Sequence, residues 1–422
     1  MDIREIGELG PAERRGLFDR DAGVDAIRED VDEILDRVRE AGDVALREFA
    51  REFDDVEVGA IDVTDRAERA AGEIDAPVRE AIGTAIDNVR DFHERAKPTD
   101  WREEFDGRTL GQRYRPVGSA GVYVPGGTAS YPSSAIMGIV PAKVAGVDHI
   151  AVATPPAENL DPVTLAAIHE AGADAVYQVG GAQAIGALAY GTDTVSATDV
   201  VVGPGNRWVT AAKASVRGDV RIDFLAGPSE ILILADGDAD ASLVAADLVA
   251  QAEHDTRAAV ALVTTDRETA NTVADEIQEQ VPARERSEVI QSALEHDASG
   301  LFHARSMSEA VLFAEEYAPE HLSIQATDDE AILSRIDSAG SVFLGPASPV
   351  AAGDYAAGPN HVLPTGGAAR VVGGLSTETF LRATTTQRLS HDGLAALRET
   401  ITTLAEAEGL EAHAASIEKR FD

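Results

Sequence analysis

Apolar residues recur at helical spacing in the first hundred positions of the chain. Residues 25–48 carry an apolar residue every three or four positions, and residues 78–95 repeat the pattern. In the first segment these residues are Ile27, Val31, Ile34, Leu35 and Val38. Because this spacing gathers side chains on one face of a helix, both segments are predicted to be amphipathic helices that serve packing.

Beyond residue 118 the pattern changes to short β-branched runs separated by helix-length segments. Between residues 118 and 230 such runs begin at Gly121, His149, Ala175, Asp199 and Arg221. A second series follows, with runs that begin at Glu230 and Ala258. This alternation predicts two α/β layers, each a parallel sheet with crossover helices. The Gly- and Pro-rich residues 345–374 are expected to be loop, and 394–420 a closing helical segment.

Acidic residues strongly outnumber basic ones. The chain contains 74 Asp and Glu against 36 Lys and Arg, a formal net charge of −38. Contacts to phosphate need patches of Lys and Arg, so this balance excludes a nucleic-acid binder and disfavours anionic membrane surfaces. The only lysines are Lys97, Lys143, Lys213 and Lys419. An acidic surface with so little lysine predicts adaptation to a halophilic cytosol, with an acidic mesophilic protein as the alternative.

The chain has no cysteine, which excludes disulfides, thiolate zinc sites and thiol nucleophiles. Its first residues are charged and lack the apolar segment of a secretory signal. Apolar runs such as residues 135–147 are interrupted well before the roughly 18 residues that a membrane span requires. We therefore expect a cytoplasmic protein with no membrane partner.

Glycine-rich segments follow several of the predicted strands. They are residues 125–128, 179–183, 202–206 and 226–230. Glycine allows the backbone to approach a ligand and leaves helix N-terminal amides free for an anion, so these loops favour a nucleotide or phosphate site. Tight turns alone would also explain them. The loop at Gly203 departs from the dinucleotide fingerprint, because Trp208 replaces its third glycine.

Residues suited to binding a metal are scattered along the chain. Gln251 and His254 lie three positions apart on a helix predicted over 241–254 and therefore share a face. Asp354 and His413 are far away in the sequence, so spacing alone does not establish a metal site, and surface roles remain open. Without cysteine, any transition metal must be held by imidazole nitrogen and carboxyl or amide oxygen, which favours an open catalytic site.

A carboxylate and an imidazole stand side by side at Glu320 and His321, directly after Pro319. Neighbouring helical residues diverge, so both reach one site only where the backbone turns, and Pro319 makes such a turn plausible. Histidine is the usual general base near neutral pH. A surface pair at a helix end remains the alternative. His361 lies seven residues after Asp354, in the same Gly-rich segment.

Eight sequence strings, taken together and in order, resemble the histidinol dehydrogenase family. They begin at Val122, Gly181, Gly203, Ala226, Gln251, Pro319, Gly353 and Glu408, and the similarity runs from about residue 25 to 420. The resemblance implies a zinc-dependent NAD oxidoreductase. Such an enzyme oxidises L-histidinol to L-histidine through L-histidinaldehyde, the last steps of histidine biosynthesis, and consumes two NAD+.

The same resemblance implies a role for individual residues. Glu320 and His321 match the acid–base pair. The zinc ligands match Gln251, His254, Asp354 and His413. Contacts to the substrate match Ser229, His361 and Glu408, with His321 and the four ligands beside them. Contacts to the nucleotide match Tyr123, Gln183 and Asn206. Members of the family are homodimers whose C-terminal arm reaches the partner's site, so Glu408 and His413 are expected to act in trans.

We accordingly expect an α/β fold of two Rossmann-like parallel-sheet domains, with a helical N-terminal segment and a C-terminal helical arm. The expected parts are an N-terminal arm over 1–24, a first α/β domain with the metal and catalytic residues over 25–118 plus 230–380, a nucleotide-binding α/β domain over 119–229 and an exchanged arm over 381–422.

The absence of cysteine also narrows the mechanism. Aldehyde oxidation through a thiohemiacetal is impossible, so the aldehyde must be hydrated, and Glu320 can assist by activating water. His321 suits removal of the hydroxyl proton in the first oxidation. Two alternatives remain open at this point: an NAD-dependent dehydrogenase of another amino alcohol, and a metal-dependent hydrolase, which would leave the glycine-rich loops unexplained.

Overall fold

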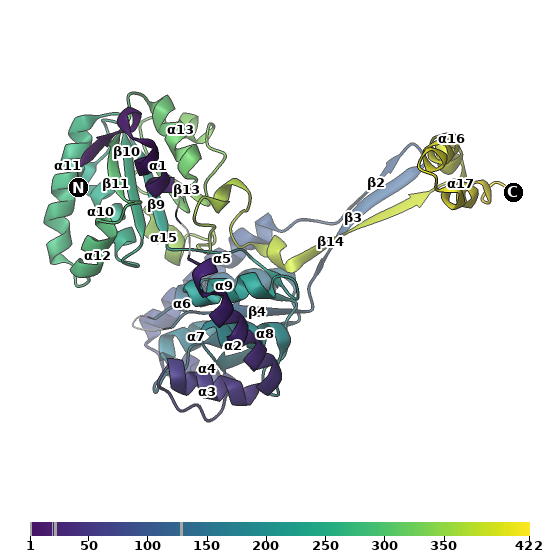
Figure 1. Ribbon diagram of the computed structural model, residues 1–422, viewed down its shortest axis with the longest axis horizontal. Coiled ribbons are helices and arrows are strands. Elements are labelled where there is room, and N and C mark those ends of the chain that lie inside the picture. The colour runs from purple at the N-terminus through teal and green to yellow at the C-terminus, as the bar shows by residue number, and fades with distance from the viewer. Residues whose placement is uncertain (1, 19, 21–22, 127–129) are drawn as a thin grey trace. The chain divides into compact units, whose positions relative to one another are not determined.

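The chain forms two compact units in a computed structural model that describes residues 2–18, 20, 23–126 and 130–422. The first unit comprises Met1–Ala96 and Val117–Phe380, and the second comprises Lys97–Pro116 and Leu381–Asp422. The first unit contains two parallel sheets with helices packed on them (Figure 1). This architecture confirms the predicted α/β class.

One parallel sheet has six strands in the order β1-β11-β10-β9-β12-β13. These strands are β1 (Ile3–Glu5), β9 (Glu230–Ala235), β10 (Ala259–Thr264), β11 (Gly300–His303), β12 (His321–Gln325) and β13 (Ser341–Leu344). Ile231 and Ile233 of β9 belong to the apolar core on one face of the sheet, and Leu232 and Leu234 to the core on the other. Burial on both faces explains why β9 is an unbroken apolar run.

Helices cover both faces of this sheet (Figure 1). One face carries α10 (Ala241–Ala252), α11 (Arg267–Gln280), α12 (Ser287–Leu294) and α15 (Val350–Tyr355). The other carries α1 (Pro11–Phe18), α13 (Met307–Tyr317) and α14 (Asp329–Leu333). Two expectations are corrected here. Residues 1–24 are not a separate arm, because β1 pairs with β11 and α1 packs against α13. The segment 345–374, expected to be loop, contains α15.

The other parallel sheet has five strands in the order β6-β5-β4-β7-β8. Its strands are β4 (Ser119–Tyr123), β5 (His149–Thr154), β6 (Ala175–Gln178), β7 (Val200–Val202) and β8 (Arg221–Ile222). Its crossover helices are α6 (Pro132–Ala145), α7 (Pro162–Ala171), α8 (Gly181–Tyr190) and α9 (Arg207–Val216). The strand and helix alternation read from the sequence therefore corresponds to βα units.

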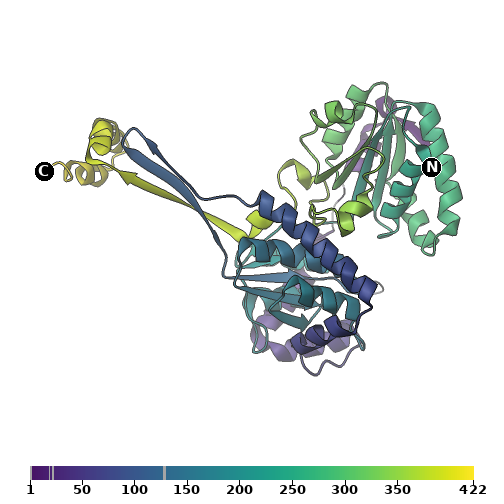
Figure 2. The same ribbon diagram turned by 180° about the vertical axis from the view of Figure 1, so that it is seen from behind.

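The long helices near the N-terminus pack on the five-stranded sheet's helices, whereas we expected residues 25–118 to group with 230–380. They are α2 (Arg28–Ala41), α3 (Asp43–Phe53), α4 (Thr64–Glu73) and α5 (Ala76–Ala96). α2 packs against α8 and α9 (Figure 1). α4 packs against α7, and α5, the long helix that faces the viewer in Figure 2, packs against α6. Gly186 of α8 permits this approach, because a Cβ there would lie 3.0 Å from Leu35 Cδ2 of α2. An apolar helix face shows that a helix packs, but not which sheet it covers.

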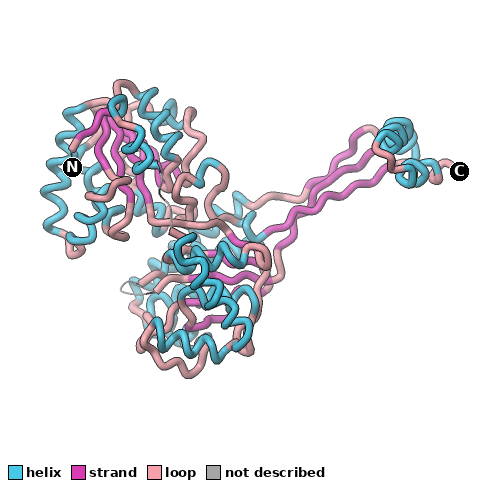
Figure 3. Tube along the Cα trace, in the orientation of Figure 1, coloured by secondary structure: helices cyan, strands magenta, loops and turns pink. Residues whose placement is uncertain are grey.

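The second unit is built around a three-stranded antiparallel sheet in the order β14-β3-β2 (Figure 3). Its elements are β2 (Trp101–Phe105), β3 (Arg108–Pro116), β14 (Leu381–Leu389), α16 (His391–Ala407) and α17 (Glu411–Glu418). The arm expected over 381–422 is therefore helical only after its first strand, and residues 97–116 belong with it. The turn between β2 and β3 packs closely against the first turn of α16. Glycine at position 107 allows this approach, because a Cβ there would lie 2.9 Å from Gly393 Cα.

The remaining helical elements in the described part of the chain are short 3-10 helices. They are η1 (Ile6–Glu8), η2 (Asp25–Ile27), η3 (Val281–Ala283), η4 (Ala368–Arg370) and η5 (Thr377–Phe380). Among the described helices, none combines the length and the apolar character needed to cross a membrane.

Candidate active site

Glu320 and His321 lie at the junction between α13 and β12, in the interior of the six-stranded sheet. α13 ends at Tyr317, and Ala318 adopts a left-handed conformation with φ of 47° that turns the chain. β12 then begins at His321, between β9 and β13. Glu320 is 6% exposed and His321 is 4% exposed. The alternative of a surface pair is therefore wrong; the chain does turn before the pair, but at Ala318, one residue before the predicted Pro319.

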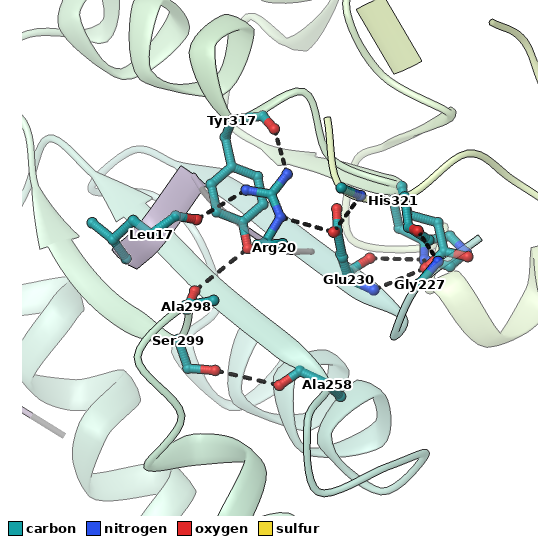
Figure 4. A network of polar contacts seen from close by, with 12 residues as sticks. Leu17, Arg20, Gly227, Glu230, Ala258, Ala298, Ser299, Tyr317 and His321 are labelled. Carbon is teal, nitrogen blue, oxygen red and sulfur yellow. Dashed lines mark hydrogen bonds and ion pairs between the residues drawn. The ribbon is translucent and has the colours of Figure 1, made fainter. Parts of the chain in front are cut away.

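The main chain of Glu230 holds both side chains. Glu230 N–H donates to Glu320 Oε2 over 2.8 Å. His321 Nδ1 donates to Glu230 O over 2.9 Å, and Figure 4 shows both residues. A carbonyl can only accept, so Nδ1 carries the proton. His321 Nε2 is buried and has no hydrogen-bond partner among the described residues. This nitrogen is therefore the one open to a ligand.

Burial and charge shift the acid–base properties of the pair. Burial raises the pKa of Glu320 to about 8. Burial lowers the pKa of His321, but the carboxylates of Glu320 and Asp354 outweigh it and raise this pKa to about 9. Perturbed titratable groups that cluster in the interior are typical of functional sites.

Asp354 lies beside His321 on α15. Its Oδ1 is 3.6 Å from His321 Nε2, which is longer than a hydrogen bond. Burial raises the pKa of Asp354, but His321, His361 and His254 lower it below its usual value. A glycine sets this position, because a Cβ on Gly353 would lie 2.7 Å from the Phe343 ring of β13. The predicted site residues His321, His361 and His254 are thus all close enough to Asp354 to lower its pKa.

His361 connects the segment after α15 to the five-stranded sheet. Its Nδ1 donates to Asp354 O over 2.7 Å, and its Nε2 lies 3.4 Å from Ser134 Oγ of α6. Burial lowers the pKa of His361. Asn360 strengthens the connection, because its Nδ2 donates to Met137 O over 2.7 Å.

Gln251 and His254 lie at the C-terminal end of α10. The helix ends at Ala252, two residues earlier than predicted, so His254 follows the helix instead of sharing its face. Burial lowers the pKa of His254, which favours the neutral, metal-binding form of the ring. Gln251 is 3% exposed, and its Nε2 has no hydrogen-bond partner in the part of the chain that the structure describes. The amide nitrogen is a donor, so the atom of Gln251 that could bind a metal is its oxygen Oε1.

No group of three or more His, Cys, Asp or Glu side chains able to hold a metal occurs within the described residues. Among the predicted zinc ligands, the first unit supplies two side chains of these types, His254 and Asp354. The remaining predicted ligand, His413, is an exposed residue of α17 in the second unit, as is the predicted substrate contact Glu408, which follows α16. The donor set of amide, imidazole and carboxylate fits a zinc ion that leaves positions open for other ligands.

The three predicted nucleotide residues lie near the carboxyl ends of the five-stranded sheet. Tyr123 ends β4, and its hydroxyl oxygen accepts from Gly181 N–H over 3.2 Å. Burial raises the pKa of Tyr123 to about 12. Gln183 is buried in the first turn of α8, and Asn206 caps α9, its amide oxygen accepting from Trp208 N–H over 2.9 Å. In open α/β sheets this edge is where ligands bind.

A buried ion pair supports the loop at Gly203. The sequence indicated the loop but not the ion pair. Lys213 of α9 pairs with Asp223, and both side chains are almost fully buried. Lys213 Nζ donates to Gly203 O over 3.0 Å, and Gly203 N–H donates to Asp223 Oδ2 over 2.9 Å. Gly203 has φ of 116°, and a Cβ there would lie 2.2 Å from Tyr123 O. The signal available in the sequence was Lys213 itself, one of only four lysines in the chain.

The fold and this centre define an α/β protein with a buried carboxylate–imidazole pair. Residues 19–421 match the family model described as histidinol dehydrogenase. The chain belongs to the histidinol dehydrogenase family and is an NAD-dependent oxidoreductase, which excludes the hydrolase alternative.

Individual relatives agree over the whole length of the chain. It is 71% identical to a histidinol dehydrogenase of Haloarcula marismortui and 66% identical to one of Natronomonas pharaonis, each over 100% of both chains. A crystal structure of histidinol dehydrogenase from Elizabethkingia anophelis superposes with a TM-score of 0.93 at 34% identity, covering 98% of this chain and 96% of that one.

Proposed function

We propose that this chain is a cytoplasmic, zinc-dependent enzyme that oxidises L-histidinol to L-histidine through L-histidinaldehyde, with NAD+ as the acceptor of both hydrides. The observation that carries the proposal is the buried Glu320–His321 pair, held by the main chain of Glu230 and facing Asp354. Two successive oxidations need a base for a hydroxyl proton and a group that activates water, and this pair supplies both.

His321 serves the first oxidation. Its Nδ1–H is committed to Glu230 O, so once the ring has lost its second proton, above its pKa of about 9, Nε2 accepts the proton of the substrate hydroxyl as hydride leaves the carbinol carbon. Asp354, 3.6 Å from this nitrogen, stabilises the imidazolium that forms. The aldehyde is then hydrated: Glu320, ionised above its pKa of about 8, accepts a proton from the attacking water, and the neutral His321 accepts the hydroxyl proton of the hydrate as the second hydride leaves to NAD+.

We assign zinc to Gln251, His254 and Asp354, with His413 of a second copy of the chain as the fourth protein ligand. The burial of Gln251, whose amide oxygen is a suitable ligand, and the lowered pKa of His254, which favours the neutral ring, support this assignment. A bound zinc ion would orient the substrate through its imidazole nitrogen and its amine, both of which are suitable ligands. Positioning of this kind can contribute on the order of 7 kcal/mol to lowering a barrier.

The remaining contacts follow from position. Ser229 directly precedes Glu230 at the start of β9, and His361 lies beside Asp354, so both are assigned to the substrate. Glu408 joins them from a second copy of the chain in a homodimer. Tyr123, Gln183 and Asn206 are assigned to NAD, because they gather at the carboxyl edge of the five-stranded sheet.

The test is a turnover assay on the zinc-loaded protein with NAD+ and a panel of amino alcohols. We expect two equivalents of NADH for each L-histidinol consumed and L-histidine as the product. One equivalent of NADH, with aldehyde accumulating, would contradict the assignment of both oxidations to this site. Preference for a different amino alcohol would establish the alternative substrate.

A further inference from the structure

Glu230 is the first residue of β9, a central strand of the six-stranded sheet, and it is 1% exposed. Its amide N–H and its carbonyl oxygen each hold one side chain of the acid–base pair. Any shift in the position of this one residue therefore moves both Glu320 and His321. What fixes Glu230 matters for the chemistry as much as for the sheet.

The side chain of Glu230 is fixed by an arginine far away in the sequence. Arg20 Nε donates to Glu230 Oε1 over 2.8 Å, and these side chains are 4% and 2% exposed. Gly366 N–H donates to the same oxygen over 2.7 Å, while Oε2 has no hydrogen-bond partner among the described residues. A buried carboxylate costs several kcal/mol unless it is paired, so Glu230 depends on Arg20.

Arg20 also binds the segment that leads into the acid–base pair. Its Nη2 donates to Tyr317 O over 2.6 Å and its Nη1 to Leu17 O over 3.0 Å (Figure 4). The guanidinium lies over the Tyr317 ring, with Cζ 3.7 Å from the ring centroid. Tyr317 is the last residue of α13, three positions before Glu320. One guanidinium thus connects the end of α13 with the start of β9.

We propose that Arg20 is a positioning residue for the acid–base pair. It fixes the start of β9, which holds Glu320 and His321 through hydrogen bonds, relative to the end of α13, which precedes both residues in the chain. Arg20 touches neither side chain of the pair in any contact given by the structure, so its effect passes through Glu230 and Tyr317. The inference rests on the proposed roles of Glu320 and His321.

The chain offers a matched control at Arg4. Arg4 Nη2 donates to Ser299 O over 2.6 Å, and its guanidinium lies over the Phe302 ring with Cζ 4.5 Å from the centroid. It therefore repeats, from β1 of the same sheet that Glu230 belongs to, the carbonyl and ring contacts of Arg20, but no bond to Glu230 is given for it. Substitution of Arg4 therefore measures how much stability and activity are lost when only a carbonyl contact and a ring contact of an arginine are removed.

The experiment compares Arg20→Met, Arg4→Met, Glu230→Gln and the double variant Arg20→Met/Glu230→Gln as zinc-loaded enzymes. Arg20→Met is expected to lower kcat for L-histidinol at least tenfold while KM for NAD+ stays unchanged, and Arg4→Met is expected to keep kcat. The double variant removes both buried charges. Its thermal midpoint should recover toward that of the unmodified protein, while its kcat stays low because the connection is still missing.

Recovery of kcat together with stability in the double variant would overturn the proposal, because a purely structural ion pair predicts that outcome. Should Arg20→Met not fold, Arg20→Lys and Glu230→Gln give the same comparison with milder changes. Glu320→Gln and His321→Asn serve as references. If these two keep full activity, the proposed function fails; if they lose activity while Arg20→Met and Arg20→Lys keep it, only the positioning role fails.

Discussion

His321 Nδ1 lies 2.9 Å from the carbonyl oxygen of Glu230. This single contact decides which imidazole nitrogen carries the proton and which faces Asp354. It also ties a side chain from the start of β12 to the main chain of the neighbouring strand β9, with which β12 is paired. The strand pairing that builds the sheet therefore also sets the geometry of the acid–base pair.

Glu320→Gln tests the division of labour between the two oxidations. Glutamine keeps an oxygen that can accept from Glu230 N–H, so the local structure is expected to survive. It cannot take a proton from water, and we expect the oxidation of L-histidinaldehyde to fall by about 10²- to 10⁴-fold, with a smaller loss for L-histidinol. Single-turnover measurements with each substrate check this. Equal losses in both steps would remove Glu320 from the water-activating role.

His254→Asn tests the zinc ligands. Loss of the ring nitrogen beside Asp354 is expected to abolish both bound zinc and turnover, and metal analysis after dialysis measures the first directly. His296→Asn, a change outside the ligand set, should keep one zinc for each chain. A His254→Asn protein with full zinc content would show that the ligand assignment is wrong.

Mixing two inactive proteins tests whether the site is shared between copies. His413→Asn and His254→Asn chains should each be inactive alone. After subunit exchange, hybrid dimers contain one site with both histidines intact, so part of the activity should return. Absence of any recovery, with hybrid formation verified by mass spectrometry, would place His413 in the same site as His254 of its own chain or in no site.

Lys213→Met tests the support of the nucleotide loop. The variant removes the cation that pairs with Asp223 and donates to Gly203 O, so the loop loses its anchor. We expect a severalfold higher KM for NAD+, an unchanged KM for L-histidinol and a loss of stability of about 3 kcal/mol or more. Lys143→Met, which breaks a half-exposed pair with Asp174, is the control and should alter neither constant. An unchanged KM for NAD+ in Lys213→Met would separate this loop from the nucleotide.

His93 predicts a loss of stability in mild acid. It is fully buried on α5, and burial lowers its pKa from 6.5 to about 4. Above pH 6.5 the ring is neutral in both states; as the pH falls toward 4, the unfolded chain binds the proton first, so stability decreases by up to about 3 kcal/mol. The free energy of unfolding, measured between pH 7 and pH 4, should change less with pH in His93→Gln than in the control His169→Gln, which changes an exposed ring. Identical slopes would contradict the prediction.

The sequence could predict those parts of the molecule whose signal is local. β9 and β10 are continuous apolar runs, and the alternation of such runs with helices indicated the parallel sheets. β2, β3 and β14 escaped notice because they lie in a sheet that is largely open to solvent, and every residue of β2 is exposed. Strands of that kind have no buried face to leave a period of two in the sequence.

The pair of Glu320 and His321 could be found from the sequence for the same reason, because the two residues are neighbours in the chain. Arg20 and Glu230 were not, because 210 positions separate them and nothing near either residue marks a partner. The grouping of Asp354, His254 and His321 likewise depends on how α10, α15 and β12 pack. The resemblance to a family supplied this grouping, and the residue spacing did not.

Pairing between β3 and β14 joins residues 108–116 with 381–389 along nine consecutive positions. A ribosome makes the first of these strands long before the second, so β3 and its hairpin partner β2 must wait while both parallel sheets of the first unit are synthesised. Until β14 emerges, one edge of the β2–β3 hairpin presents unpaired main-chain groups that attract other chains. Truncation before residue 381 would leave that edge uncovered, so β14 also protects the hairpin against aggregation.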